Sequence, residues 1–363
     1  MRKVIAITTV YFIRHAESDS SVHEGRTRPL TEKGLKDRAL VTSFLLDKNI
    51  DAVLSSPFKR AVDTVSDFAD GKGLQMVLIE DFKEHDTISD NYPTSEYFSF
   101  INKYWTDFNY KVHNDESLFE LQKRNITAFN RILAEYRNKT VVIGTHGMAL
   151  STIINYFDPT YKFENFLDMV KIKPWVVRMD FNDDGCVGME KIDLFHPGQK
   201  PDIKKCKVYT VGLGMLKAYR YTVIFARHNE KWLYCRAKER DTFETAGGHI
   251  EPGETPLDGA KRELYEETGA VSFDIAPLFD YSVHYPNVYS NGQVFYARID
   301  QLGDLPDYEM AEVKLYDEIP DKMRFPEILP VLFRKVRECI SIRSKSNGLS
   351  LSARILSRNA SIE

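Results

Sequence analysis

Acidic and glycine residues recur with a fixed spacing at residues 247–270, whose sequence is GGHIEPGETPLDGAKRELYEETGA. Pro256 suits the first turn of a helix, Thr255 can cap that turn, and Gly269 can end the helix in a left-handed conformation. The spacing therefore predicts a helix over 256–268. At about 100° per residue, its carboxylates fall within an arc of roughly 100° beside an apolar stripe made by Leu257, Ala260 and Leu264.

The clustered carboxylates belong to Glu263, Glu266 and Glu267. They repel one another unless a cation lies among them, and hard oxygen ligands select Mg²⁺ or Mn²⁺. Such ions also hold the phosphates of a substrate, so the cluster predicts a metal site at which an activated water attacks a phosphoanhydride. A solvated acidic helix face is the alternative. It leaves unexplained why a Gly-Gly turn, Glu254 and Arg262 accompany the carboxylates.

The stretch resembles the box of the Nudix hydrolases at every charged and glycine position. This resemblance implies that Glu266 and Glu267 are the main metal ligands and that Glu263 is a ligand or the general base. The carbonyl of Gly247 is expected to complete the ligand set.

Other residues of this half are expected to support the metal site. The resemblance implies that Arg262 pairs with Glu254 and braces the loop. Nudix enzymes often recruit one more carboxylate from a later loop. Glu309 and Glu312 are the candidates, with plain surface charge as the alternative for both.

A second group of chemically active residues follows three β-prone runs in the first half of the chain. The runs at 10–13, 52–54 and 140–144 are predicted to be buried strands, with an amphipathic helix between the first two. Strands that alternate with helices predict a mostly parallel sheet, in which ligands bind beyond the carboxyl ends of the strands. The residues that follow these runs are Arg14, His15, Arg60 and His146.

Two arginines and two histidines that converge at one sheet edge would form a pocket for a phosphate dianion. Guanidinium groups bind phosphate oxygens bidentately, and a neutral imidazole nitrogen can attack phosphorus and divide hydrolysis into two easier steps. An isolated Arg-His pair is structural in most proteins. Three such sites in order favour catalysis.

These residues together resemble the histidine phosphatase, or phosphoglycerate mutase-like, superfamily. The matching motifs are RHAES at 14–18, SPFKRA at 56–61 and HG at 146–147. The resemblance implies that His15 is the phosphohistidine, that Arg14 and Arg60 bind phosphate, and that His146 is the second pocket histidine. No cofactor is expected at this site.

The family also uses a carboxylic acid to protonate the leaving oxygen. Glu84 is preferred over Glu80 for this role, because an apolar residue precedes it by two positions as the family pattern prefers. The chain departs from the pattern at Ser21, where the family often has Asn. This departure lies at the pocket rim and puts mutase activity in doubt more than hydrolysis.

A chain of 363 residues is too long for one ordinary core, so two domains are predicted. A hairpin about the turn at 182–185 closes the first domain, and HPGQKP at 196–201 marks the boundary. The predicted division is a histidine phosphatase domain at 1–198, a linker at 199–216, a Nudix domain at 217–340 and a mobile tail at 341–363. The expected folds are a phosphoglycerate mutase-like α/β/α sandwich with a mostly parallel sheet, and a Nudix α/β/α domain with a mixed sheet.

Composition excludes several classes of protein. A hydrophobic content of 43% with 28% charged residues is that of a globular protein, and a net charge of −4 argues against nucleic acid as a partner. The four cysteines lie far apart, which predicts neither a zinc site nor a disulfide framework. The N-terminal run lacks a cleavage site, and no stretch approaches the roughly 18 apolar residues that a membrane span needs. We therefore expect a cytoplasmic protein without a membrane partner.

The predicted function is that of a bifunctional phosphohydrolase acting on small phosphorylated molecules. The whole chain resembles, in reversed domain order, bacterial fusions of the two families that are related to nucleotide-pool sanitising enzymes. This implies hydrolysis of 8-oxo-dGTP or a related nucleotide at the Nudix site, with phosphate removal at His15, in consecutive steps on one compound. Two alternatives remain: one domain senses a ligand and regulates the other, or His15 serves an isomerase of a phosphorylated sugar acid.

Overall fold

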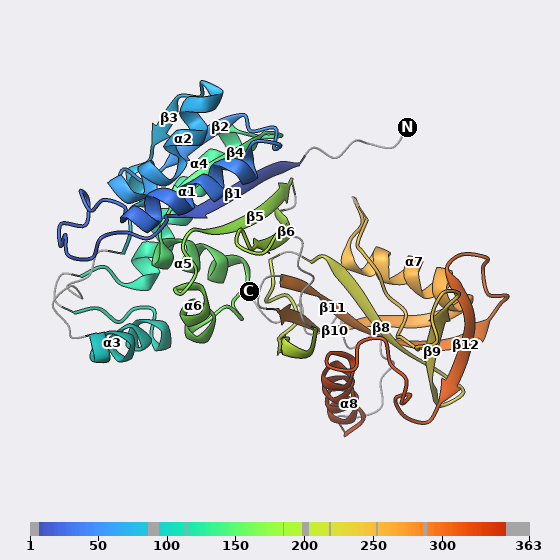
Figure 1. Cartoon of the computed structure of the whole chain (residues 1–363). Coiled ribbons are helices and arrows are strands. Elements are labelled where there is room, and N and C mark those ends of the chain that lie inside the picture. Colours follow the sequence, from blue (N-terminus) through green and yellow to red (C-terminus); the bar gives the residue numbers. More distant parts are fainter. Residues whose placement is uncertain are drawn as a thin grey trace. The chain divides into compact units, whose positions relative to one another are not determined.

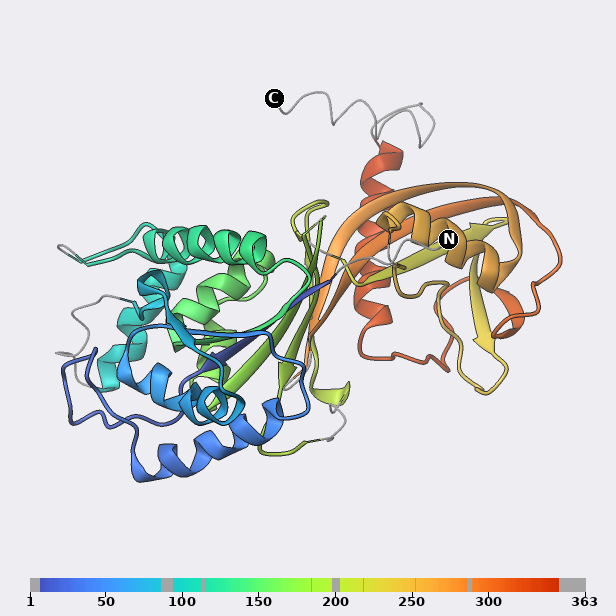
Figure 2. The same ribbon diagram turned by 90° about the horizontal axis from the view of Figure 1, so that it is seen from above.

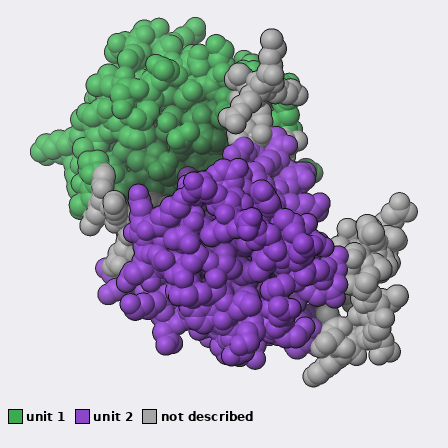
Figure 3. Space-filling model, turned by 90° about the vertical axis from the view of Figure 1, so that its right-hand side faces the viewer, with its two compact units in different colours: residues 1–200 green, residues 201–363 purple. Residues whose placement is uncertain are grey.

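The structure is a computed structural model that describes residues 7–85, 94–112, 115–183, 185–197, 203–217, 219–251, 253–285 and 289–345. The chain divides into two compact units, Met1–Lys200 and Pro201–Glu363 (Figures 1 and 3). No helix in the described part of the chain is long and apolar enough to cross a membrane.

A six-stranded sheet with the strand order β3-β2-β4-β1-β5-β6 forms the centre of unit 1. Its first four strands run parallel, and β5 and β6 form an antiparallel hairpin at one edge. The strands are β1 (Thr8–Arg14), β2 (Ala52–Ser55), β3 (Met76–Leu78), β4 (Thr140–Thr145), β5 (Trp175–Asn182) and β6 (Gly185–Ile192). The helices are α1 (Glu32–Leu45), α2 (Lys59–Lys72), the 3₁₀ helix η1 (Glu80–Phe82), α3 (Thr94–Thr106), α4 (Leu118–Glu135), α5 (Gly147–Phe157) and α6 (Phe163–Met169).

Helices cover both faces of this sheet (Figure 2). On one face, α1 and α2 bury Leu45 and Phe68 against β-strand residues such as Val142. On the other face, the ring of Phe129 in α4 contacts those of Phe12 and Phe181, with ring centroids 5.2 and 5.1 Å apart. Burying each such side chain contributes about 1.5–3 kcal/mol. The α/β/α sandwich predicted for the first half is confirmed.

Unit 2 contains a second six-stranded sheet, with the order β12-β9-β8-β11-β10-β7. It is mixed, because β8 and β11 run parallel whereas the other neighbours are antiparallel. Its elements are the 3₁₀ helix η3 (Ile203–Lys205), β7 (Lys207–Val211), β8 (Tyr221–His228), β9 (Lys231–Ala237), α7 (Pro256–Thr268), β10 (Ala270–His284), β11 (Tyr289–Leu302), β12 (Met310–Tyr316) and α8 (Leu329–Lys345).

One helix packs on each face of the second sheet. Leu264 of α7 lies in a core with Ile224 and Phe295, and Phe333 of α8 packs on the opposite face against Phe225. The predicted α/β/α arrangement with a mixed sheet is therefore confirmed for this half as well.

Two segments differ from the sequence-based expectation. The predicted linker at 199–216 contains β7, because Lys207–Val211 pair with the end of β10 about 70 residues later in the chain. The predicted tail at 341–363 begins inside α8, which continues to Lys345. Residues 346–363 lie outside the described residues.

Candidate active sites

The ends of β1, β2 and β4 bring together the residues that the sequence assigned to a phosphate pocket. Parallel pairing places Arg14, at the end of β1, beside Thr145, at the end of β4. His15 and His146 follow these two residues directly. The chain leaves β2 at Ser55 and enters α2, whose second residue is Arg60. All four predicted residues therefore meet at the carboxyl edge of the sheet, and each is buried.

Hydrogen bonds fix the tautomer of His15. Its Nδ1 lies 2.7 Å from the carbonyl oxygen of Ala16, and its Nε2 lies 3.1 Å from Nε of Arg60. Because a carbonyl oxygen only accepts and the guanidinium only donates, Nδ1 carries the proton and Nε2 carries the lone pair. Burial, followed by the charges of Arg60 and Arg14, lowers the pKa of His15 well below its usual value. The imidazole is thus a neutral base at physiological pH.

His146 is the second neutral imidazole of the pocket. Its ring centroid lies 5.3 Å from that of His15 in an edge-to-face arrangement, and its Nε2 lies 2.7 Å from the Ser56 hydroxyl. Burial lowers the pKa of His146 well below the ordinary value, and the Arg60 charge adds to this effect. Neither histidine therefore contributes a positive charge before a substrate binds.

Arg14 is held by backbone oxygens. Its Nη1 donates to the carbonyls of Met169 and Ile172, each at 2.9 Å. A Cβ at Gly147 would lie 3.4 Å from Nε of Arg14, which is van der Waals contact. The guanidinium of Arg14 therefore lies against the start of α5.

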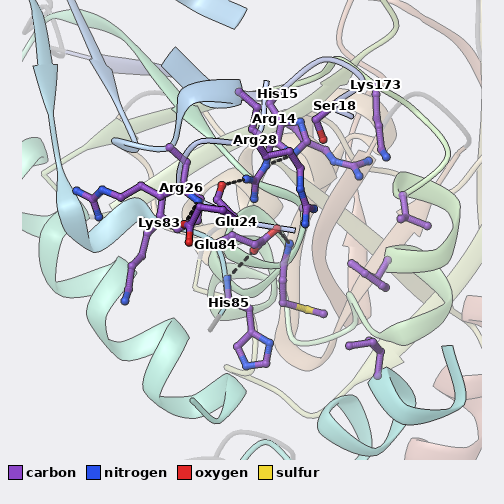
Figure 4. Close-up of a pocket in the computed structure, with 18 of the residues that line it drawn as sticks. Arg14, His15, Ser18, Glu24, Arg26, Arg28, Lys83, Glu84, His85 and Lys173 are labelled. Atoms are coloured by element: carbon purple, nitrogen blue, oxygen red, sulfur yellow. Dashed lines mark hydrogen bonds between the residues drawn. The ribbon is translucent and has the colours of Figure 1, made fainter. Parts of the chain in front are cut away.

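A cavity of about 530 Å³ opens beside these groups (Figure 4). Its wall contains more basic than acidic side chains. The basic ones are Arg14, Arg26, Arg28, Arg60, Lys83 and Lys173, and the acidic ones are Glu24, Glu80 and Glu84. The excess of cations makes the cavity suited to an anion with several negative charges.

The two candidate acids occupy different positions in this cavity. Glu84 accepts hydrogen bonds from the backbone N–H groups of Met148 and Ala149, at 3.2 and 3.1 Å, so it lies at the N-terminus of α5 beside His146. Glu80 is mostly exposed and accepts two hydrogen bonds from Arg26.

Arg124 of α4 braces the loop that carries Glu84. Its guanidinium donates to the carbonyls of Lys83 and Glu84, each at 3.0 Å, and pairs with Glu116. The structure places it behind the loop, where it positions the backbone.

In unit 2, the helix predicted at 256–268 is observed with those bounds as α7. Thr255 Oγ1 accepts from the N–H of Asp258 at 3.2 Å, and the Asp258 carboxylate accepts from the N–H of Thr255 at 3.1 Å. Gly269 ends the helix at φ 71°. These contacts at the two ends fix the bounds of α7, and so they fix the positions of the carboxylate-bearing residues on it.

Arg262 is the centre of the carboxylate cluster. It donates to both oxygens of Glu254, at 2.7 and 2.9 Å, so the expected pair is formed. The same guanidinium donates to Glu263 at 2.8 Å and to Glu266 at 3.1 Å. The cation between the helix carboxylates is therefore an arginine of the same helix.

Glu267 lies apart from that network and deeper in the unit. Its Oε2 accepts from the N–H of Gly247 at 2.9 Å. Burial raises the pKa of Glu267 to about 8, with further contributions from the charges of Glu263 and Glu244. A buried carboxyl group with raised pKa is expected to ionise fully once a cation compensates it.

The donor set fits a divalent ion, although among the described residues no group of three or more His, Cys, Asp or Glu is gathered closely enough to hold one. The ligand atoms available are hard oxygens, and Glu263 and Glu266 already share a cation. A Cβ at Gly248 would lie 2.2 Å from Oε1 of Glu263, so a larger residue there would displace this carboxylate from its observed position. The fit therefore rests on donor chemistry and on the space left by the Gly-Gly turn.

The later carboxylates differ in their surroundings. Glu309 is exposed, and Glu312 pairs with Arg236 and Lys314 on the surface of β12 and β9. Glu244 was missed by sequence reasoning: its side chain is 8% exposed, it pairs with Arg240 and Arg324, and its charge raises the pKa of Glu267. In the sequence, only the position of Glu244 four residues before Gly248 indicated that it lies near the carboxylates of α7.

Comparisons with known proteins assign each half to a family model. Residues 10–188 match the histidine phosphatase superfamily (branch 1), and residues 216–317 match the NUDIX domain. The "Uncharacterized phosphatase PhoE" of Bacillus subtilis is 29% identical over 153 residues, which are 41% of this chain and 76% of that protein. The "Putative 8-oxo-dGTP diphosphatase YtkD" of Bacillus subtilis is 28% identical over 129 residues, which are 33% of this chain and 81% of that protein.

A solved structure is similar to one half of the chain. Bacillus stearothermophilus YhfR has 22% sequence identity and a TM-score of 0.43, and the match covers 49% of this chain and 94% of that one.

Proposed function

We propose that this chain, a hydrolase that joins a histidine phosphatase domain to a NUDIX domain, removes phosphate from monoesters at His15 and cleaves a nucleoside polyphosphate at the carboxylates of α7. Both domain families consist of phosphohydrolases, and relatives of each half act on small phosphorylated molecules.

At the first site, His15 Nε2 attacks the phosphorus of a monoester that Arg14, Arg60 and His146 hold. A P–N bond forms as the P–O bond to the leaving group breaks, and protonated Glu84 donates its proton to the leaving oxygen. Water then attacks the phosphohistidine, so that a P–O bond forms as the P–N bond breaks and the lone pair returns to His15 Nε2, and the Glu84 carboxylate accepts the proton of that water. The position of Glu84 beside the helix that follows His146 supports its choice over the exposed Glu80.

The observation that best supports phosphate removal at His15 is the lone pair on its Nε2. The Nδ1–H···O bond to Ala16 turns Nε2 toward Arg60, and the lowered pKa keeps it unprotonated. A neutral nitrogen among arginines is suited to attack a dianion, and the arginines neutralise the charge that develops on the phosphoryl oxygens. No metal is needed for that role, so we propose that this site works without one.

At the second site, NUDIX domains generally use a divalent metal, and we propose Mg²⁺ or Mn²⁺ here. Glu263, Glu266 and Glu267 would hold the ion with the Gly247 carbonyl, and the bound ion would supply an activated water and charge neutralisation at the phosphoanhydride. Glu254 and Arg262 brace the loop, because the guanidinium joins Glu254 to the carbonyl of His249. Glu263 has a raised pKa, mainly through burial, which suits a ligand or a general base.

The proposed substrate of the second site is a nucleoside polyphosphate such as 8-oxo-dGTP, supported by the likeness to YtkD. The net negative charge of the chain gives no support to a polymeric nucleic acid. We further propose that the two sites act in sequence on one compound, as in sanitation of the nucleotide pool. The cytoplasmic location stays a prediction from the sequence.

The test is product analysis after incubation of a nucleotide panel that includes 8-oxo-dGTP. Wild type, Glu267→Gln and His15→Ala are each assayed with Mg²⁺ and with chelator. We expect Glu267→Gln and chelation to abolish cleavage of the phosphoanhydride, and His15→Ala to abolish only the later release of phosphate. Nucleotide cleavage that survives both Glu267→Gln and chelation would refute the assignment of the second site.

A further inference from the structure

The cations that line the phosphatase cavity differ in how they are compensated. Arg26 forms a bidentate pair with Glu80, and Arg28 donates to the carbonyl of Val22 at 2.7 Å. Arg60 donates to His15 and to the carbonyl of Gly25. These groups already have oxygen or nitrogen partners in the protein.

Lys173 is different. Its ammonium group forms no hydrogen bond and no ion pair with any residue in the described ranges, although it lies in the cavity wall and is half-buried. The carboxylate of Glu17 is near enough for its charge to act on Lys173, but this carboxylate accepts a hydrogen bond from the Thr31 hydroxyl at 2.9 Å. Among the described residues, Lys173 is therefore a cation in the cavity wall that no carboxylate contacts directly.

The position of Lys173 is fixed by contacts of Arg14 with residues on either side of it. Arg14 donates to the carbonyl of Ile172, and its own backbone pairs with Trp175 at the start of β5. Lys173 lies between these two contacts, so it is held next to Arg14. Figure 4 draws Lys173 beside Ser18, on the opposite side of His15 from Arg26 and Lys83.

A half-buried lysine among arginines is costly unless an anion offsets it. Burial and the Arg14 charge lower its pKa to about 8, so the group is still mostly charged at neutral pH. Structural lysines usually find a carboxylate or extend into solvent. The cavity has a volume of about 530 Å³, which is within the usual range for small-molecule sites. It therefore has room for more than one phosphate group.

On the premise that the cavity is the phosphomonoesterase site, we propose that Lys173 binds a second anionic group of the substrate. The preferred substrates are then phosphate monoesters that carry a further phosphate or a carboxylate. Lys173 would act as a specificity-determining residue and not as part of the bond-breaking machinery.

The test compares kcat/KM for two pairs of esters that differ only in the second anion. The first pair is 3-phosphoglycerate against glycerol 3-phosphate, which tests a carboxylate. The second is adenosine 3′,5′-bisphosphate against adenosine 5′-monophosphate, which tests a phosphate. Wild type, Lys173→Met, Lys173→Arg and the control Lys171→Met are compared. Lys171 is exposed, pairs with Asp168 and does not line the cavity.

We expect wild type to prefer the doubly anionic member of at least one pair. Lys173→Met should lower that preference by roughly tenfold to a hundredfold, the worth of one charge-assisted hydrogen bond. Lys173→Arg should keep most of the preference because it keeps the charge, and Lys171→Met should keep all of it. A Lys173→Met variant that lowers both members of a pair equally, or a wild type without preference in either pair, would overturn the inference.

Failure of the underlying function would look different. If wild type releases phosphate from none of the four esters, the assignment of the cavity as a phosphatase is refuted, and the role of Lys173 is refuted with it. Thermal unfolding of each variant separates a loss of fold from a loss of preference. If Lys173→Met does not fold, the decisive comparison passes to Lys173→Gln, with the same expected drop.

Discussion

The side chains of the two candidate phosphate sites carry opposite charges. In unit 1, the cavity is lined by an excess of cations around two neutral histidines. In unit 2, carboxylates gather around a single guanidinium, that of Arg262. The first site can receive a phosphate dianion directly, whereas the second would repel one. This difference in charge is the basis for the proposal that a divalent cation lies between protein and substrate at the second site, and that the first site works without one.

The two sites also differ in the contacts that orient their side chains. His15, Arg60 and Arg14 are fixed by hydrogen bonds to backbone carbonyls, so the groups that would contact phosphate are already oriented. Glu263 and Glu266 are oriented by Arg262, whose position depends in turn on Glu254. Preorganisation therefore comes from the sheet edge in one unit and from a bracing ion-pair network in the other.

The largest expected effect is on the acid of unit 1. Glu84→Gln keeps the shape of the side chain but removes the proton donor, so kcat for an alkyl phosphate should fall by roughly 10²–10⁴-fold. The fall should be much smaller with p-nitrophenyl phosphate, whose leaving group needs no protonation. Steady-state kinetics on both substrates provide the measurement.

The matched control for that variant is Glu80→Gln. An exposed ion pair is worth about 0.2–1 kcal/mol, so this change should alter kcat less than about fivefold. Equal losses in the two variants would contradict the choice of Glu84.

Removal of the Arg262 guanidinium tests whether the carboxylates around it need a cation. Arg262→Met leaves Glu254, Glu263 and Glu266 without their shared partner, which should destabilise unit 2 by about 1.5–3 kcal/mol in the presence of chelator. Added Mg²⁺ should recover part of the loss, because it supplies the missing charge. Thermal unfolding of the full chain with and without Mg²⁺ measures the effect.

Arg298→Met serves as the control on the same unit. Arg298 pairs with Asp274 on the exposed surface, so its loss should cost little and should not respond to Mg²⁺. An Arg262→Met protein as stable as this control would argue against the bracing role.

The preference of unit 1 for a doubly anionic ester should depend on pH through the charge of Lys173. The groups whose charges act on Lys173 are Arg14, Arg60, Arg28 and Glu17, and its pKa is lowered to about 8. The ammonium charge is present below that pH and lost above it. The preference for a doubly anionic ester, measured as a ratio of kcat/KM values, should therefore fall by roughly tenfold between pH 7 and pH 9. In Lys173→Arg the ratio should stay flat, since arginine does not titrate there.

The smallest expected effect concerns the cap of α7. Thr255→Ala removes the side-chain acceptor for the N–H of Asp258 and should destabilise unit 2 by about 1 kcal/mol. Urea unfolding followed by tryptophan fluorescence of Trp232, in a Trp105→Phe, Trp175→Phe background, reports on that unit. Thr255→Ser should restore the stability, and a Ser variant as unstable as Ala would contradict the capping argument.

Local signals explain what the sequence could predict. Helix α7 was predicted with its observed bounds because Thr255, Pro256 and Gly269 act within one turn of its ends. The convergence of Arg14, His15, Arg60 and His146 followed from the rule that parallel strands share a carboxyl edge. Neither inference required knowledge of distant contacts.

Long-range contacts explain what the sequence could not predict. Lys173 enters the cavity because Trp175 pairs with Arg14 across more than 150 residues of chain. Glu244 is buried by a partner, Arg324, that lies 80 residues away. β7 lies within the segment predicted to be a linker, and the residues of β10 that pair with it lie about 70 residues later in the chain.

The most direct test of two sites with opposite electrostatics is one chelator titration of the wild-type protein, followed with two substrates in parallel. Hydrolysis of a phosphate monoester and cleavage of 8-oxo-dGTP are measured at each concentration of EDTA. We expect nucleotide cleavage to fall to background and to return with added Mg²⁺, while monoester hydrolysis stays constant throughout. Loss of both activities together, or survival of both, would contradict this expectation.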